Sequence, residues 1–127
     1  MNGDIILIVE DEGLIALHLM EMLAEAGFTV PDPLASGEDF LDYLTRSPRP
    51  DIILMDIGLG GKMDGIETAR EMRKKYRIPV IFLTAYSDEK RMEEVQKVTP
   101  YMCLTKPVMQ HDLLLALEKV LGDRAGQ

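Results

Sequence analysis

The sequence predicts a single α/β domain, in which a doubly wound parallel sheet carries helices on both faces. Five short runs rich in apolar residues alternate with longer amphipathic segments along the 127 residues, a length that fits one domain. The clearest runs are apolar throughout, which is typical of strands covered on both faces. Because strand–helix–strand connections are right-handed, five consecutive units of this kind form a five-stranded parallel sheet between two helical layers.

The predicted elements have recognisable limits. Strands are expected at Ile5–Val9, Phe28–Val30, Ile52–Met55, Val80–Leu83 and Tyr101–Leu104. Helices are expected at about Gly13–Ala26, after Ser36, after Asp64, at about Asp88–Val98 and at about Gln110–Leu121. Ser36 and Asp64 are each followed three residues later by an acidic residue, which resembles a capping box. Gly27 and Gly122 are expected to end the first and last helices in the left-handed conformation.

Composition and charge exclude several classes of protein. No apolar run is long enough to cross a membrane, and the N-terminus lacks the cationic region of an export signal. With one cysteine, Cys103, the chain forms no internal disulfide, so a reducing, cytoplasmic location is expected. The formal net charge of −8 disfavours a general nucleic-acid surface. It suits cation binding or a basic partner, and equally a role in solubility alone.

Three carboxylates are expected to converge at one edge of the sheet. Glu10 and Asp11 follow the first strand, and Asp56 follows the third. The carboxyl ends of parallel strands share one edge, where the functional groups of such folds gather. Carboxylates placed so closely raise one another's pKa unless a cation joins them. The expected ion is Mg²⁺, which typically takes one or two carboxylates and keeps several waters.

Two further strand ends add a hydroxyl group and a positive charge. Thr84 and Ala85 follow the fourth strand, and Lys106 and Pro107 follow the fifth. A divalent cation, a lysine and a hydroxyl around Asp56 are what phosphoryl transfer to an aspartate nucleophile requires. Taken singly, each residue has a structural explanation as a dipole complement, a turn, a cap or a solvated charge. Their joint occurrence at four strand ends favours a reactive site.

Four motifs lie at these strand ends, LIVEDE, ILMDIGLGGKMDGIE, PVIFLTAYSD and LTKP. Through them the chain resembles the receiver domain of two-component response regulators, the CheY-like family, over about Asp4 to Leu121. The resemblance implies a flavodoxin-like sheet of five strands in the order 2-1-3-4-5, surrounded by five helices. A receiver domain is expected at residues 1–122, and residues 123–127 are expected to be a tail or the start of a linker.

The resemblance also implies roles for individual residues. Asp56 would accept a phosphoryl group from the phosphohistidine of a histidine kinase, and the domain would catalyse only its own phosphorylation and dephosphorylation. The expected Mg²⁺ ligands are Glu10, Asp11, Asp56 and the backbone carbonyl of Gly58. The expected contacts of the phosphoryl group are Thr84, Ala85 and Lys106. Pro107 would hold the following turn, with a cis bond to Lys106.

A switch is expected to connect this site to an output surface. In the family, the usual output surface is the face made by the fourth helix, fifth strand and fifth helix. The predicted helix at Asp88–Val98 has few apolar anchors, which suits an element with two positions. Thr84 would shift inward on activation, together with an aromatic residue three positions before the lysine. Cys103 holds that position, so Tyr101, on the same face of the strand, is the candidate substitute, and Cys103 is otherwise a small buried hydrophobe.

Three other functions fit parts of the sequence. A flavodoxin-like electron carrier shares the fold, but the acidic residues at 10–12 would repel a flavin phosphate. An aspartate phosphatase needs a second aspartate where Gly58 stands. A receiver-shaped scaffold that binds partners without phosphorylation stays open, because Cys103 departs from the family pattern. The expected partners are a histidine kinase, a downstream protein or attached output domain, and a second copy in a homodimer; nucleic acid and membrane are not expected.

Overall fold

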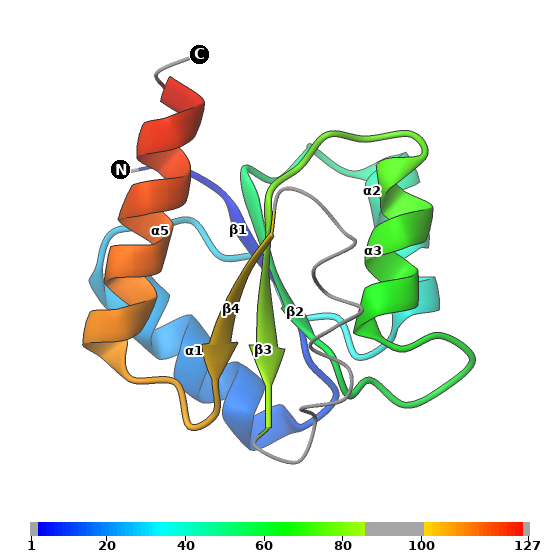
Figure 1. Ribbon diagram of the computed structural model, residues 1–127, viewed down its shortest axis with the longest axis horizontal. Helices are drawn as coiled ribbons and strands as arrows, with labels where there is room; N and C mark the ends of the chain where they lie inside the picture. Colours follow the sequence, from blue (N-terminus) through cyan, green and yellow to red (C-terminus); the bar gives the residue numbers. More distant parts are fainter. Residues whose placement is uncertain (1–2, 86–100, 126–127) are drawn as a thin grey trace.

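A four-stranded parallel sheet forms the centre of the computed structural model, which describes residues 3–85 and 101–125 (Figure 1). Its strands are β1 (Ile6–Val9), β2 (Ile52–Asp56), β3 (Val80–Thr84) and β4 (Tyr101–Thr105), hydrogen-bonded in the order β1-β2-β3-β4. Each predicted strand except the second is therefore confirmed, with boundaries that shift by one residue at most. Every residue of β1, β2 and β3 is buried, as expected for strands covered on both faces.

Helices cover both faces of this sheet (Figure 1). They are α1 (Gly13–Glu25) and α5 (Gln110–Ala125) on one face, and α2 (Gly37–Arg46) and α3 (Gly65–Arg73) on the other. Neighbouring strand residues enter different cores: Leu54 packs beneath α1 and α5, whereas Ile53 and Met55 pack beneath α2 and α3. No helix in the described part of the chain has the length and apolar character that a membrane crossing needs. The helix predicted at Asp88–Val98 lies outside the described residues.

The segment predicted as the second strand, Phe28–Val30, lies beside β1 but forms no regular strand, so this prediction is wrong in detail. The pairing consists of two isolated parallel bridges, at Thr29 and Leu34. In a parallel ladder, every second residue donates its backbone N–H to the neighbouring strand. After Thr29, the next residues in position to donate to β1 would therefore be Pro31 and Pro33. Neither proline has an N–H group. Leu34 donates instead, at 2.9 Å to a carbonyl of β1, one residue out of step.

The predicted starts of two helices and the predicted end of another are confirmed. Ser36 Oγ accepts a hydrogen bond from the backbone N–H three residues later at 3.1 Å, and Asp64 Oδ1 accepts the equivalent bond at 2.9 Å. Gly27, after α1, has a φ of 95°, the left-handed conformation that ends a helix. Local capping chemistry therefore fixes where α1 ends and where α2 and α3 begin.

The last helix runs past its predicted end, so the prediction for Gly122 is wrong. α5 continues through this residue to Ala125. A glycine inside a helix costs only about 1 kcal/mol relative to alanine. Leu117 and Leu121 are buried and hold the turns that precede it. The domain limit at residue 122 stays a prediction, although it falls within a helix.

Three helices begin with a glycine, and the three glycines have different surroundings. A Cβ atom at Gly65, the first residue of α3, would lie 2.1 Å from the backbone oxygen of Asp56. At Gly37, the first residue of α2, it would lie 2.0 Å from Oγ1 of Thr68. At Gly13, the first residue of α1, it would meet nothing within 4 Å. Gly65 thus allows α3 to start directly against the strand end that carries Asp56.

Replacing Gly65 with alanine should destabilise the protein by about 1–3 kcal/mol, the usual cost of overpacking, as measured by urea denaturation. Gly13→Ala is the matched control, because it makes the same change at the first residue of a helix without a steric conflict. It should leave the free energy of unfolding unchanged or raise it by up to about 1 kcal/mol. Equal effects of the two substitutions would contradict the role given to the contact at Gly65.

Candidate functional site

The predicted site residues gather where the carboxyl ends of four strands meet. Glu10 follows β1, Asp56 ends β2, Thr84 ends β3 and Lys106 follows β4. Glu10, Asp56 and Thr84 are buried, with 2, 4 and 4% of their surface exposed, and Lys106 is partly buried. The predicted convergence is confirmed by the structure. The chemical roles of these residues stay predictions.

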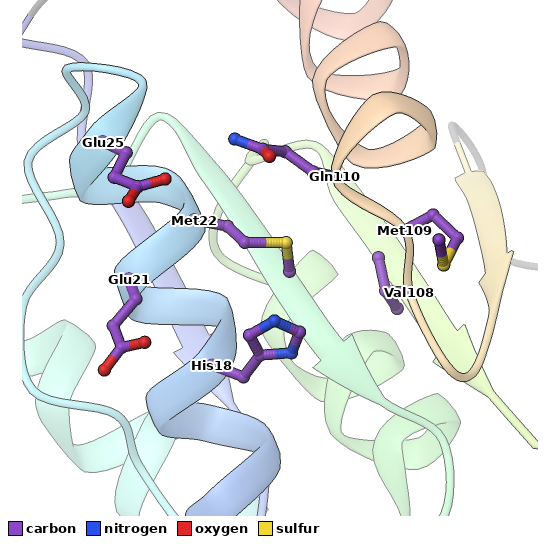
Figure 2. A pocket seen from close by; sticks show the side chains of 7 residues that line it. All are labelled: His18, Glu21, Met22, Glu25, Val108, Met109 and Gln110. Atoms are coloured by element: carbon purple, nitrogen blue, oxygen red, sulfur yellow. The ribbon is translucent and has the colours of Figure 1, made fainter.

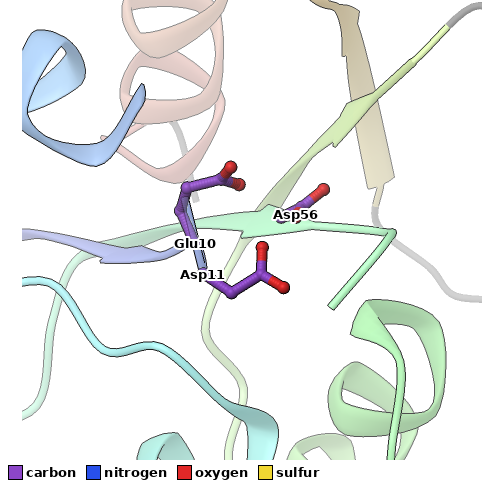
Figure 3. A group of neighbouring side chains, drawn as sticks. All are labelled: Glu10, Asp11 and Asp56. Carbon is purple, nitrogen blue, oxygen red and sulfur yellow. The ribbon is translucent and has the colours of Figure 1, made fainter. Parts of the chain in front are cut away.

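Three carboxylates lie together at this edge of the sheet (Figure 3). Glu10, Asp11 and Asp56 each offer one oxygen, and these oxygens all lie within 4.8 Å of one another. Burial, reinforced by the neighbouring Asp56, raises the pKa of the Glu10 carboxyl to about 7. Ligand oxygens around an octahedral Mg²⁺ are about 3–4 Å apart. The three carboxylates fit such an ion after small side-chain movements, and its charge would favour the ionised form of Glu10.

A lysine ammonium bridges two of these carboxylates. Lys106 Nζ donates to Asp56 Oδ1 at 3.0 Å and to Glu10 Oε1 and Oε2 at 3.1 and 3.2 Å. Burial alone would lower the pKa of Lys106, but its hydrogen bonds and ion pairs with Asp56 and Glu10 outweigh burial and raise it. The peptide bond between Lys106 and Pro107 is cis, as predicted. Lys106 therefore stays charged and lies where it would contact a group attached to Asp56.

The glycine-rich loop after β2 donates backbone N–H groups to two of the carboxylates. Gly58 N donates to Asp56 Oδ1 at 3.0 Å, and Gly60 N donates to Asp11 Oδ2 at 3.2 Å. Between them, Leu59 is buried in the core beneath α2 and α3. The sequence reasoning missed Gly60 and Leu59, although the run of glycines signals close approach of backbone to other groups. The role of the Gly58 carbonyl as a metal ligand stays a prediction.

The hydroxyl of Thr84 faces the backbone of its own strand end. Thr84 Oγ1 donates to the carbonyl of Ala85 at 3.1 Å, and the backbone N–H of Lys106 donates to the Thr84 carbonyl at 2.8 Å. The single hydroxyl proton is therefore engaged by Ala85. Rotation of the side chain would release this proton for another acceptor.

The cysteine at the expected aromatic position is half-buried. Cys103 pairs in register with Phe82 of β3 and packs in the core beneath α2 and α3. Burial raises the pKa of its thiol to about 11, so the thiolate is scarce at neutral pH. These surroundings agree with a small buried hydrophobe. The side chain of Tyr101, the candidate substitute, lies outside the described part of the chain.

A shallow groove separates the middle of α1 from the start of α5 (Figure 2). Its volume is about 350 Å³. Met22 and Val108 are buried at its base, and the carboxylates of Glu21 and Glu25 lie along the α1 side. No predicted site residue lines this groove, which is therefore a separate surface feature.

Comparison with known families identifies the chain. The family model of the response regulator receiver domain, which describes the sequences of that family, matches residues 6–118 of this chain. The chain belongs to this family. Together with the parallel sheet, the match establishes the flavodoxin-like receiver fold. The structure describes four strands and four helices; the fifth helix stays a prediction, and two isolated bridges at Thr29 and Leu34 stand in place of the fifth strand.

Two curated relatives are longer than this receiver domain. The transcriptional regulatory protein PdtaR of Mycobacterium tuberculosis is 34% identical over 113 residues, which are 89% of this chain and 54% of the relative. The positive alginate biosynthesis regulatory protein of Pseudomonas aeruginosa is 40% identical over 116 residues, which are 90% of this chain and 46% of the relative. The chain spans about half the length of these regulators.

Two solved structures share the fold over nearly the whole chain. One is the N-terminal domain of a response regulator/sensory box/GGDEF three-domain protein from Carboxydothermus hydrogenoformans, with a TM-score of 0.88, 33% identity, and 97% and 98% of the two chains covered. The other is the receiver domain of the sensor histidine kinase PA1611 from Pseudomonas aeruginosa, with a TM-score of 0.84, 31% identity, and coverage of 94% and 98%. The latter has a magnesium ion coordinated in its active-site cleft.

Added Mg²⁺ should stabilise this receiver domain, because its charge offsets the repulsion among the three carboxylates. At ten times the dissociation constant the gain is about 1.4 kcal/mol, measurable as a rise in the melting temperature. Asp11→Asn should reduce this rise by removing one ligand charge. Glu12→Gln is the matched control, since Glu12 is an exposed neighbour outside the cluster, and it should retain the rise. An equal loss in both variants would contradict a specific cation site.

Replacing Lys106 with methionine should destabilise the receiver domain by about 2 kcal/mol, as measured by urea denaturation. The substitution keeps most of the apolar side chain but leaves Glu10 and Asp56 without their ammonium partner. Lys119→Met is the control, because Lys119 is exposed on α5 and should tolerate the change. If Lys106→Met unfolds at the same urea concentration as the wild type, the ion pairs do not contribute to stability.

Proposed function

We propose that this receiver domain is the phosphoacceptor module of a two-component signalling system, and that Asp56 receives its phosphoryl group from a histidine kinase. The proposal rests on one observation, the surroundings of the Asp56 side chain. This buried carboxylate lies between a charged lysine, a backbone N–H group and two further carboxylates suited to a divalent cation. An aspartate placed in this way has what an in-line phosphoryl transfer requires.

The two oxygens of Asp56 have different surroundings, which suggests their roles. Lys106 and Gly58 both donate to Oδ1, so Oδ2 is the proposed nucleophile. Oδ2 attacks the phosphorus of the phosphohistidine, the P–N bond breaks, its electron pair returns to the imidazole, and an acyl phosphate forms on Asp56. Mg²⁺ held by Glu10, Asp11, Asp56 and the Gly58 carbonyl would neutralise charge on the phosphoryl oxygens.

Lys106 and Thr84 would then respond to the new group. The Lys106 ammonium, already at Asp56, would pair with a phosphoryl oxygen. The Thr84 hydroxyl would leave the Ala85 carbonyl and donate to the phosphoryl group, next to the backbone N–H of Ala85. This rearrangement would alter the face formed by the predicted fourth helix, β4 and α5. Because Cys103 is small, the proposed switch uses Tyr101 or no aromatic residue.

The proposed setting is a larger signalling assembly in the cytoplasm. The similar regulators extend well beyond the region they share with this chain, and one similar receiver belongs to a sensor histidine kinase. We therefore propose that a downstream protein or an attached output domain reads the phosphorylation, with a homodimer as one form of the active state. The domain would act on no external substrate and would catalyse only its own phosphorylation and dephosphorylation.

The decisive experiment is the intact mass of the protein after incubation with acetyl phosphate and Mg²⁺. The wild type should gain one phosphoryl group, and Asp56→Asn should gain none. Asp32→Asn is the matched control, because Asp32 is an exposed loop aspartate, and it should be phosphorylated like the wild type. Removal of Mg²⁺ with EDTA should abolish the gain in both competent proteins.

Two outcomes would contradict this function. Phosphorylation of Asp56→Asn would place the acceptor elsewhere. Absence of phosphorylation in the wild type, together with failure to form a stable complex with beryllofluoride and Mg²⁺, would favour the scaffold that works without phosphorylation. A stable beryllofluoride complex without a detectable mass gain would instead show a competent site with rapid turnover.

A further inference from the structure

The charges of this receiver domain are unevenly distributed. Residues 42–51 and 67–77 carry seven Lys and Arg residues and four Asp and Glu residues, a formal charge of +3. Since the whole chain carries −8, the remaining 106 residues carry −11. The two segments span the ends of α2 and α3 and the connections into β2 and β3. They therefore meet at the amino end of the sheet, opposite the edge that holds Asp56 (Figure 1).

A tyrosine joins the two segments into one surface. Tyr76 Oη donates to the backbone carbonyl of Leu44 in α2 at 3.4 Å. The Arg49 guanidinium lies over the Tyr76 ring, 6.0 Å from its centroid. Lys75 and Arg77 flank this tyrosine in the chain and are exposed. The surface, here called the basic end, comprises Arg46, Arg49, Arg70, Lys74, Lys75 and Arg77.

Ordinary structural roles explain only part of the basic end. Arg46 pairs with Asp42 at 2.9 Å, and Lys74 pairs with Glu71 at 2.9 Å. Arg70 lies in the last turn of α3, where a cation complements the helix dipole. Lys75 and Arg77 lie beyond the helix and form no ion pair with another described residue. Lys75 and Arg77 thus present positive charge to solvent without a structural counterpart, and Arg49 contacts the Tyr76 ring but forms no ion pair with another described residue.

We propose that the basic end binds a short acidic segment of a protein partner. Arginine forks bind carboxylates in a bidentate manner, and Arg49 is already oriented by Tyr76. A segment of a few carboxylates matches the few unpaired cations. A long nucleic acid would extend past the basic end. It would then meet the rest of the chain, whose formal charge of −11 repels phosphate groups. Because the basic end lies at the opposite end of β2 from Asp56, such a partner would leave the phosphorylation site open.

The test is an NMR titration of the ¹⁵N-labelled chain with a synthetic peptide of six consecutive glutamates at low salt. Amide shifts should change at Arg46, Ser47 and Arg49 and at residues 74–77, and these changes should fade as sodium chloride is added. Lys75→Gln combined with Arg77→Gln should weaken binding about fivefold or more, because two exposed charge contacts are lost. An oligo-dT of about twenty nucleotides should bind more weakly than the peptide, because it extends past the basic end onto acidic surfaces.

The matched control is Lys62→Gln combined with Lys119→Gln, which removes the same charge from exposed positions elsewhere. It should weaken peptide binding less than twofold, by long-range screening alone. Three results would overturn the proposal: no localised shifts in the wild type, equal weakening in both double variants, or tighter binding of oligo-dT than of the peptide. Matching melting temperatures of all variants would show that the variants are folded. The titration needs no phosphodonor, so its outcome does not depend on whether Asp56 is phosphorylated.

Discussion

An ammonium group held between two buried carboxylates joins strand ends that are far apart in the sequence. Lys106 lies 96 residues after Glu10 and 50 residues after Asp56, yet it donates to both. Burying either carboxylate without the lysine would leave an uncompensated charge, which is costly in a protein interior. The charges are paired only when the ends of β1, β2 and β4 meet. The charges of the site are therefore compensated only when the strands have their correct order in the sheet.

The loop after β2 supports this arrangement with backbone groups. Gly58 and Gly60 bring N–H groups to Asp56 and Asp11, while Leu59 anchors the loop in the core. Gly65 brings the start of α3 against the backbone of Asp56. A Cβ atom at Gly65 would collide with this backbone, whereas Cβ atoms at Gly58 and Gly60 would make only ordinary van der Waals contacts, 3.7 and 3.6 Å from the carboxylate oxygens of Asp56 and Asp11. The loop is thus held by contacts on both sides, and close approach requires a glycine where the loop meets α3, at Gly65.

Most of the sheet and the convergence of the site could be predicted from the sequence, because both depend on local patterns. All-apolar runs marked four strands within one residue, and the polar residues that end those runs had to share an edge. The distances between individual side-chain atoms of the site could not be predicted. The contact of Lys106 with two carboxylates, and the engagement of Thr84 with Ala85, depend on side-chain directions that strand pairing alone leaves open. Gly122 misled the prediction because buried leucines nearby outweigh its weak helix propensity.

The irregular segment beside β1 has a consequence for association between molecules. A straight edge strand offers a row of unpaired N–H and C=O groups on which another chain can build, the usual start of sheet-mediated aggregation. Here the outermost segment contains Pro31 and Pro33 and shifts by one residue before it pairs again at Leu34. A foreign strand would find no continuous register along it. The same prolines that interrupt the ladder therefore protect this side of the sheet from unwanted growth.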